Sequence, residues 1–490
     1  MLRRHVKAWD KRWHYSDISI EGDLFAQKAL RFDMYHLLIA APPEDIDVSI
    51  PAKTLTGEWY KGHVFWDTEI YVLPFFIYTQ PKVAKEFLLY RYRRLKQAQD
   101  RARAQGYKGA LWPWESAVSG EDETPQAWVN FDGTVIPVYN SRREHHIAGD
   151  VIYGVFLYYQ VTGDEDFMLR YGAEMIFEAA RFWASRVTYN KQSERYEIKE
   201  VIGPNEFQEC VNNNSYTNAL AKWTLRRAFE LYQHLSEKHQ RKLGALASKI
   251  GLRNEEVNAW WEIAKRMVFL IQSDGLIEEF EGYFARKDVV IKEWDENGMP
   301  ILPSEVKLAE AKETQLVKQA DVLLLLRLFS DEFSLNVKRI NFDYYERRTT
   351  HKSSLSIPSY AIVAGELGET EKAYKYFIPA VSTDLDDIYG NTELGIHAAA
   401  LGGVWQIALN GFAGMKLKGD ALSIVPTLPE PWQSMRFRVW FRDALIDFSI
   451  LKDGVEAFVA KSRRGVNVEL YGRKYFLHQG ERVSARYIDG

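Results

Sequence analysis

The sequence contains almost nothing that would tie it to a disulfide-rich, metal-binding or membrane protein. Its single cysteine, Cys210, excludes an intramolecular disulfide and a zinc site built from several cysteines. Its longest apolar runs, such as residues 322–326, are far shorter than the roughly 20 residues that cross a bilayer. The first ten residues carry charge and no apolar stretch of the kind that a signal peptide needs. We therefore expect a soluble protein of the cytoplasm.

Charge excess and cofactor motifs are also lacking. With 63 basic and 67 acidic residues the net charge is -4, which gives no general attraction to nucleic acid or to an anionic membrane. There is no Walker A loop and no glycine fingerprint of a dinucleotide-binding fold. The histidines are scattered, and the adjacent His145 and His146 have no third ligand at a spacing typical of a metal site. We expect no nucleic-acid or membrane partner, no metal and no organic cofactor.

Aromatic residues are the one biased class, because 15 Trp, 27 Tyr and 26 Phe make up 14% of the 490 residues. Buried aromatic side chains usually fill a core, and this chain is long enough to have a large one. Aromatic side chains also provide flat surfaces for the apolar C–H faces of sugar rings. Composition leaves both interpretations open.

The periodicity of apolar residues divides the chain into two parts. Up to about residue 414 the pattern is helical, with long loops containing Gly, Pro and Trp between the helices. From 415 to 490, short alternating segments separated by turn residues predict a small antiparallel β domain. The predicted fold is therefore mainly α, and paired helices of similar length suit a closed helical toroid. The expected helices cover residues 82–104, 151–160, 171–186, 217–237, 255–272, 313–329, 356–365 and 370–377.

Two segments pair a tryptophan with a carboxylate. Trp66 and Asp67 are followed by Thr-Glu, and Trp114 and Glu115 stand in a Trp-Pro-Trp-Glu-Ser sequence. A tryptophan plane can stack on a sugar ring while the neighbouring carboxylate accepts hydrogen bonds from its hydroxyl groups. The simpler interpretation of Asp67 is a helix cap. An aromatic residue on a proline-containing loop, such as Trp114, is harder to assign to the core.

Two polar segments lie close to predicted helices. Glu206 ends a Gly-Pro-Asn-Glu sequence, and polar neighbours could keep its carboxyl group protonated or position a leaving oxygen. The alternative is an asparagine-rich turn with a helix cap. Lys318 and Gln319 are adjacent donors suited to hydroxyl groups, and here the alternative is an ordinary amphipathic helix.

A further segment has the composition of an oxyanion site. His351, Ser353 and Ser354 stand close together before a predicted helix, and His397 follows some 40 residues later in a Gly-Ile-His sequence. Clustered hydroxyl groups, a histidine and backbone N–H groups ahead of a helix can bind an anion such as phosphate. The alternative is a helix cap with additional serines.

Each motif is weak alone, but together and in this order they resemble glycoside hydrolase family 65, from about Trp13 to about Gly414 and more loosely to the end. That family contains inverting phosphorylases of maltose, trehalose, kojibiose and nigerose, and some hydrolases. The resemblance implies an (α/α)6 barrel over residues 1–414, with a short N-terminal linker segment, and a C-terminal β domain over 415–490. Family members usually carry an N-terminal β-sandwich, which we expect this chain to lack. The motifs are Gly62-His-Val-Phe-Trp-Asp-Thr-Glu69, Trp112-Pro-Trp-Glu-Ser116, Gly203-Pro-Asn-Glu206, Lys318-Gln-Ala-Asp321, His351-Lys-Ser-Ser-Leu-Ser356 and Gly395-Ile-His397.

The resemblance also implies a reaction. Glu206 would be the general acid that protonates the glycosidic oxygen. Phosphate, a co-substrate rather than a cofactor, would attack the anomeric carbon from the opposite face and give β-glucose 1-phosphate and a released sugar. The implied partners are a disaccharide or oligosaccharide and phosphate, and a homodimer is compatible with the family. The implied glucosyl-binding residues are Trp66, Asp67, Trp114, Glu115, Lys318 and Gln319, and the implied phosphate-binding residues are His351, Ser353, Ser354 and His397.

The substrate and the reaction type have alternatives. Residues 143–147 and 387–392 look closer to kojibiose and trehalose phosphorylases than to maltose phosphorylase, which favours a kojibiose-like α-1,2-glucoside. A family hydrolase with Glu393 as base is one alternative, disfavoured by the oxyanion-type serines. A non-catalytic sugar-binding remnant is another, disfavoured by the retained acid, and a purely structural toroid would leave the tryptophan–carboxylate loops unexplained. The acid motif reads Pro-Asn-Glu-Phe-Gln-Glu where many relatives have Pro-Asp-Glu-Tyr-His-Glu, so the acid's polar surroundings should differ.

Overall fold

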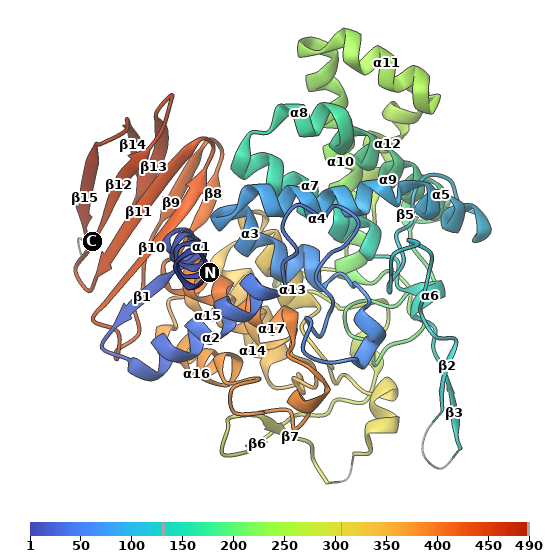
Figure 1. Ribbon diagram of the computed structural model, residues 1–490. Coiled ribbons are helices and arrows are strands. Elements are labelled where there is room, and N and C mark those ends of the chain that lie inside the picture. The colour runs from blue at the N-terminus through green and yellow to red at the C-terminus, as the bar shows by residue number, and fades with distance from the viewer. Residues whose placement is uncertain (130–132, 305, 488–490) are drawn as a thin grey trace.

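The helices of the chain close into a ring, with a layer of strands at one side (Figure 1). A computed structural model describes residues 1–129, 133–304 and 306–487. Six inner helices contact one another in chain order, and the last, α17, packs against the π-helical turn over Thr68–Val72 that leads into the first. This closure makes an (α/α)6 barrel. The inner helices are α3 (Leu73–Thr79), α7 (Ile147–Thr162), α10 (Ser215–Lys238), α13 (Val322–Leu328), α15 (Ile357–Glu366) and α17 (Ala398–Gln406).

A second set of helices covers the inner ring. All nine residues of α17 are buried, as expected for a helix that is apolar on every face. The outer helices each bury one apolar face against the ring and turn charged residues outward, as Glu255 and Glu262 do on α12. The outer helices are α2 (Leu24–Ala40), α4 (Pro81–Arg93), α9 (Ala173–Arg186), α12 (Asn254–Arg266), α14 (Leu335–Glu346) and α16 (Thr370–Val381).

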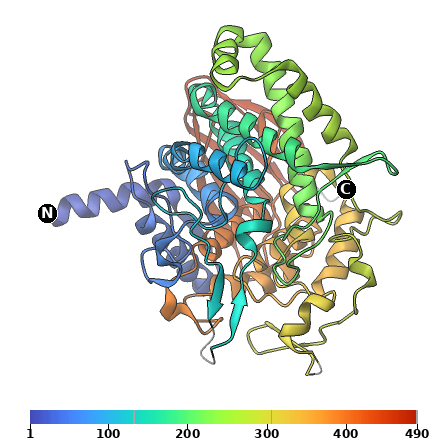
Figure 2. The same cartoon turned by 90° about the vertical axis from the view of Figure 1, so that its right-hand side faces the viewer.

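Several shorter helices lie outside this double ring. The N-terminal α1 (Leu2–Ser16) projects from the body of the molecule (Figure 2). No helix within the described part of the chain has the length and apolar character needed to cross a bilayer. The other accessory helices are α5 (Leu95–Ala104), α6 (Asn140–Arg143), α8 (Glu165–Phe167) and α11 (Gln240–Ile250).

The C-terminal strands form two sheets, in the orders β1-β10-β11-β12-β15 and β14-β13-β9-β8. Strand β1 comes from near the N-terminus and pairs antiparallel with β10, so that Ile18 lies opposite Phe437. The pairs are antiparallel except for β9 and β13, which run parallel. The strands are β1 (Ile18–Glu21), β8 (Lys416–Lys418), β9 (Ala421–Ile424), β10 (Ser434–Phe441), β11 (Ala444–Leu451), β12 (Gly454–Lys461), β13 (Val466–Leu470), β14 (Arg473–Leu477) and β15 (Arg482–Arg486).

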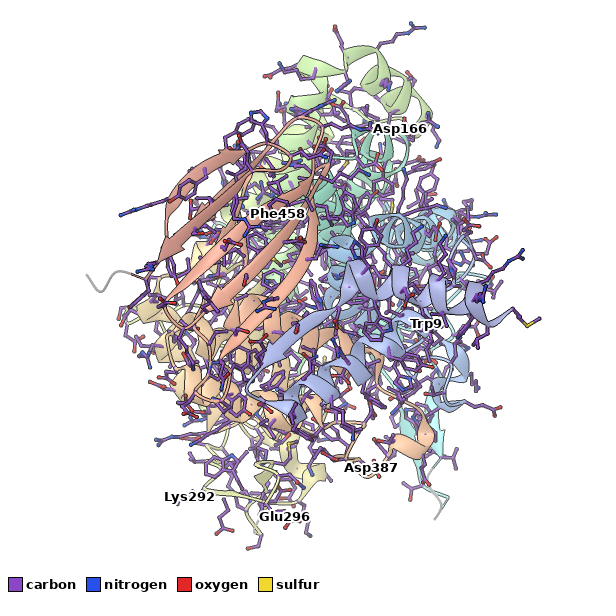
Figure 3. All side chains as sticks on the ribbon, turned by 60° about the vertical axis from the view of Figure 1, so that its left-hand side comes forward. Trp9, Asp166, Lys292, Glu296, Asp387 and Phe458 are labelled. Carbon is purple, nitrogen blue, oxygen red and sulfur yellow. The ribbon has the colours of Figure 1, made fainter. Side chains whose placement is uncertain are left out.

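The sheets are fixed to the barrel through an aromatic contact. Trp432 is fully buried, with its ring centroid 4.8 Å from that of Phe412 and 5.5 Å from that of Phe377. The five-stranded sheet, on which Phe458 of β12 lies (Figure 3), also contacts the barrel helices α3 and α7 through β10. The predicted fold class, a mainly α (α/α)6 barrel with a small and largely antiparallel C-terminal β domain, is confirmed.

Three predicted helices differ from the structure. The helix expected over residues 255–272 is too long, because α12 ends at Arg266 and Met267 is extended and bridges to Tyr196. The helix expected over residues 82–104 is divided at Arg94 into α4 and α5. The helix expected over residues 313–329 is wrong in its first half, because α13 begins only at Val322. Residues before it are extended, since Val317 pairs in parallel with Thr349 and its backbone N–H donates to the Arg348 carbonyl. This pairing overrides local helix propensity and turns residues 318 and 319 toward the barrel axis.

Candidate active site

A cavity of about 460 Å³ lies where the segments that precede the six inner helices meet. This volume falls within the range of small-molecule sites. Asp387, close to the cavity-lining Tyr389, lies at the end of the molecule opposite α11 (Figure 3). The hairpin of β2 (Ala127–Val129) and β3 (Val135–Pro137) also contributes to the wall. One lining residue from ahead of each inner helix, in chain order, is Asp67, Asn140, Glu206, Lys318, Ser353 and His397.

Most of the site residues predicted from the sequence line this one cavity. Two of the eleven, Glu115 and His351, do not, and they lie behind its wall. The nine that line it are Trp66, Asp67, Trp114, Glu206, Lys318, Gln319, Ser353, Ser354 and His397.

The loop that carries Glu206 is clamped against the extended segment before α13. The Asn205 side-chain oxygen accepts from the Lys318 backbone N–H at 2.9 Å. The Gln319 amide donates to the Pro204 carbonyl at 2.8 Å. The Lys318 ammonium donates to Glu206 itself. Burial acts to lower the pKa of Lys318, but the charge of Glu206 and the hydrogen bond to it outweigh burial and raise the pKa.

Two buried carboxyl groups hold this loop from behind. Asn205 donates from its side-chain amide to Glu279 at 2.8 Å and from its backbone N–H to Asp321 at 3.3 Å. Asn214 donates to the same oxygen of Asp321 at 3.0 Å. Burial raises the pKa of Glu279 and brings that of Asp321 to about 6. Asn205 and Asn214 therefore support the loop that carries Glu206, in a segment for which an asparagine-rich turn was the alternative interpretation from the sequence.

Trp66 and Asp67 form another part of the wall. Trp66 is only 2% exposed, and its ring meets the edge of His146 with centroids 5.0 Å apart. His146 is fixed between Asp150, 2.6 Å from Nδ1, and Glu144, 3.0 Å from Nε2. Burial, with a smaller contribution from Glu206, raises the pKa of Asp67 to about 7. Trp66 is thus almost entirely covered by other residues and has little surface left for stacking on a sugar, and Asp67 is the polar group of the pair.

The second tryptophan–carboxylate pair is divided between the cavity and its support. Trp114 is half-buried on Phe65, with centroids 4.9 Å apart and rings at 88°. Its indole N–H is buried and has no hydrogen-bond partner within residues 1–129, 133–304 and 306–487. Glu115, 4% exposed, accepts from His63 Nδ1 at 2.7 Å, and burial raises its pKa. Glu115 supports the Trp114 loop, whereas Trp114 faces the cavity.

The residues of the predicted oxyanion site are likewise divided. Ser353 and Ser354 line the cavity just before α15, and His397 lines it as the residue that caps α17. His351 is 3% exposed and lies 2.7 Å from the Ser356 hydroxyl through Nδ1. Burial lowers the pKa of His351 to about 3, so its ring is neutral at pH 7. Its place is therefore beneath the serine loop rather than at the cavity surface.

Several cavity residues were not anticipated from the sequence. Lys53 lines the wall beside His397, and no residue pattern around it indicates a site. Tyr389 and Asn391 also line the cavity. Both lie in the 387–392 segment, which was used only to choose between substrates, so that a signal for them was present. In the part of the chain that the structure describes, no group of three or more His, Cys, Asp or Glu side chains is arranged to hold a metal ion.

Comparisons with known proteins agree with this geometry. Residues 31–406 match the model of the glycosyl hydrolase family 65 central catalytic domain, and residues 415–477 that of the family's C-terminal domain. The chain is 46% identical over 475 residues to a kojibiose phosphorylase of Thermoanaerobacter brockii, covering 96% of this chain and 61% of the relative. It is 37% identical over 486 residues to an α,α-trehalose phosphorylase of Geobacillus stearothermophilus, covering 98% and 61%.

A solved structure gives the same result. It is of a protein from human microbiome, provisionally described as a kojibiose phosphorylase, and it aligns with a TM-score of 0.88 at 30% identity. The alignment covers 99% of this chain and 69% of that one. The chain spans about three fifths of the length of the curated relatives named above. With family models matching most of its residues and these identities over nearly its whole length, the chain belongs to glycosyl hydrolase family 65.

Proposed function

We propose that this chain catalyses the inverting phosphorolysis of an α-glucosyl disaccharide with a kojibiose-like linkage. The products are β-glucose 1-phosphate and the released sugar. The observation that carries the proposal is that one cavity holds both Glu206, on a clamped loop, and the oxyanion-type group of Ser353, Ser354 and His397. Relatives that are named kojibiose phosphorylase, 36–46% identical to this chain, support the choice of linkage.

The proposed reaction balances with one acid and one phosphate. Glu206 gives its proton to the glycosidic oxygen as the bond from that oxygen to the anomeric carbon breaks. An oxygen of hydrogen phosphate forms the new bond from the opposite face, through an oxocarbenium-like transition state. The phosphate's own proton then restores Glu206. Because phosphate is already an anion, the reaction needs no carboxylate base.

Lys318 and Asp67 have complementary parts in this proposal. Lys318 donates to Glu206 in the structure. A glucosyl hydroxyl group that accepts from Lys318 in place of Glu206 leaves the acid free to take up its proton. The carboxyl group of Asp67, whose pKa burial raises to about 7, can donate to one sugar oxygen or accept from a hydroxyl group.

Hydrolysis by water is the competing reaction. An inverting hydrolase needs a carboxylate base about 6.5–9.5 Å from its acid, with a water between them. Glu393, the base considered from sequence, is exposed and is not among the described residues that line the cavity. Its position weighs against the hydrolase.

A product assay tests the proposal. The chain is incubated with kojibiose, nigerose, maltose and trehalose, each with and without inorganic phosphate, and β-glucose 1-phosphate and free glucose are quantified. We expect phosphate-dependent β-glucose 1-phosphate from kojibiose. Release of two glucose units without phosphate would replace the proposal by hydrolysis, and the α anomer of the phosphate ester would overturn inversion.

Glu206→Gln is the decisive variant. It removes the proton while keeping the shape of the side chain, and we expect kcat to fall by about 10²–10⁴-fold. The matched control is Glu209→Gln, a carboxylate of the same loop that also lines the cavity. Its effect should be below about tenfold, which corresponds to 1.4 kcal/mol of barrier. An equal loss of kcat in Glu206→Gln and Glu209→Gln would contradict the specific role of Glu206 as the acid.

A further inference from the structure

A lysine outside all the motifs lies at the oxyanion end of the cavity. Lys53 is 4% exposed, and that small surface lines the cavity. Its Nζ lies 2.7 Å from Nε2 of His397. Asp384 accepts from Nδ1 of the same ring at 2.7 Å and from the His397 backbone N–H at 2.9 Å. With Nδ1 donating to Asp384, Nε2 has its lone pair directed at the Lys53 ammonium, so that His397 acts on an anion through Lys53 rather than by donating to it. The chain of contacts from Asp384 to Lys53 therefore ends in a cation at the cavity wall.

The backbone holds Lys53 against His397. The Ala398 N–H donates to the Ala52 carbonyl at 2.9 Å, which joins the residue before Lys53 to the residue after His397. Gly395 has φ near 111°, and a Cβ at that position would lie 2.9 Å from the Cβ of Lys53. Only glycine satisfies both conditions without displacing the neighbouring chain. The glycine of the Gly-Ile-His motif thus has a physical role, which is to let the two segments approach.

The charge of Lys53 is not neutralised by a direct partner. Its hydrogen-bond partner within the described residues is the imidazole of His397 rather than a carboxylate. Burial lowers the pKa of Lys53 to about 8, although the negative charges of Asp384, Asp67 and Asp387 act to raise it. At pH 7 the Lys53 side chain is therefore mainly in its cationic form. An ammonium has three donors, and His397 takes one, so that two remain for an anion in the cavity.

We propose that Lys53 is a further phosphate-binding residue, whose ammonium donates to a phosphate oxygen and is oriented by the Asp384–His397 pair. This inference rests on the phosphorolysis proposed above and adds the cation that the hydroxyl groups of Ser353 and Ser354 do not supply. Hydrogen bonds from charged donors to a phosphate are short and strong. Phosphate affinity should therefore depend on Lys53 more than sugar affinity does.

The test compares three variants of the full chain in phosphorolysis with phosphate as the varied substrate. Lys53→Met removes the charge at nearly constant length, and we expect the KM for phosphate to rise about 10- to 100-fold. Lys53→Arg keeps a cation and should recover part of that loss. The matched control is Lys61→Met, an exposed lysine eight positions further along that does not line the cavity. Its KM for phosphate should stay within about twofold of the unsubstituted chain.

A second measurement separates binding from support of the fold. The KM for the disaccharide and the thermal midpoint should change little in Lys53→Met, while the KM for β-glucose 1-phosphate in the reverse reaction rises with that for phosphate. A purely structural role would shift both sugar and phosphate constants and lower the midpoint. If Lys53→Met does not fold, Lys53→Gln, which can still hydrogen-bond the His397 ring, takes its place.

The outcomes for the two proposals are distinct. An unsubstituted chain that releases product from the disaccharide without phosphate contradicts the proposed function itself. A phosphate-dependent chain whose KM for phosphate is unchanged by Lys53→Met leaves phosphorolysis standing and overturns the role of Lys53. Direct titration of inorganic phosphate into both proteins, without sugar, should show the same loss of affinity.

Discussion

A buried ion pair beneath the cavity wall at Trp66 gives the sharpest prediction of stability. Arg91 on α4 donates from Nε to Glu69 at 2.7 Å and from Nη2 to the second Glu69 oxygen at 3.0 Å. The same Nη2 donates to the Phe65 carbonyl at 3.0 Å, next to Trp66. The two side chains are 1% and 2% exposed. Glu69→Gln should therefore leave a buried guanidinium without the carboxylate that it is paired with.

The magnitude follows from the burial of both partners. Removing one partner of a buried, hydrogen-bonded pair costs about 3–5 kcal/mol. An unfolding entropy of about 2.1 cal/mol/K per residue gives about 1 kcal/mol per degree over 490 residues. The thermal midpoint should therefore fall by about 3–5 °C if the chain unfolds as one unit. The assay is calorimetry or circular dichroism on matched samples, with kcat measured below the transition.

Two comparisons make this prediction refutable. The double variant Glu69→Leu with Arg91→Met removes both charges and should recover much of the loss, since replacing a buried pair by apolar residues is often neutral. Glu44→Gln breaks an exposed pair with Lys82 and should leave the midpoint unchanged. A Glu69→Gln midpoint equal to that of the Glu44→Gln control would refute the reasoning, because burial would then have no energetic consequence.

Two further predictions concern the cavity. Burial raises the pKa of Asp67 to about 7, so from about pH 4 upward the unfolded state loses this proton before the folded state does, and folding is progressively penalised until about pH 7. The thermal midpoint of Asp67→Asn minus that of the unsubstituted chain should therefore increase from about pH 4 to about pH 7 and stay constant above that, while KM for the sugar rises. A difference that does not change between about pH 4 and about pH 7 would refute the assignment. At Gly203 a Cβ would lie 2.4 Å from the Asn214 amide and 2.5 Å from Asp321, so Gly203→Ala should displace the acid loop and lower kcat at least about tenfold. An active Gly203→Ala variant with an unchanged circular dichroism spectrum would contradict that account of the loop.

Much of the fold and the family could be predicted because they were indicated by short motifs and by the periodicity of apolar residues within single segments. The six motifs indicated the family, and that resemblance is confirmed. The change from helical to alternating periodicity near residue 415 indicated the C-terminal sheets. The roles of the site residues, the boundary after residue 414, a homodimer and a cytoplasmic location stay predictions.

What could not be predicted depends on contacts distant in sequence. The extended conformation around Lys318 comes from pairing with residues some 30 positions later, so helical periodicity gave the wrong answer there. Glu115 and His351 stand in the right motifs, but their partners His63 and Ser356 hold them behind the wall. Lys53 reaches the cavity only because a segment 340 positions away is packed against it. Residue type alone could not show which member of each motif lines the cavity, because tertiary pairing decides that.

The convergence of motifs so far apart in sequence follows from the barrel. Each inner helix returns to the same end of the ring after an outer helix, so the six segments ahead of the inner helices meet there. The N-terminal ends of α10, α15 and α17 thus point toward one cavity, and helix N-termini favour negative charge. The positive ends of these helices suit an anionic co-substrate. They also stabilise the negative charges of Asp67 and Glu206 in the same small volume. A cation at this end, such as Lys53, adds to the positive potential of the helix N-termini. Its removal should therefore lower the affinity for phosphate more than the affinity for sugar.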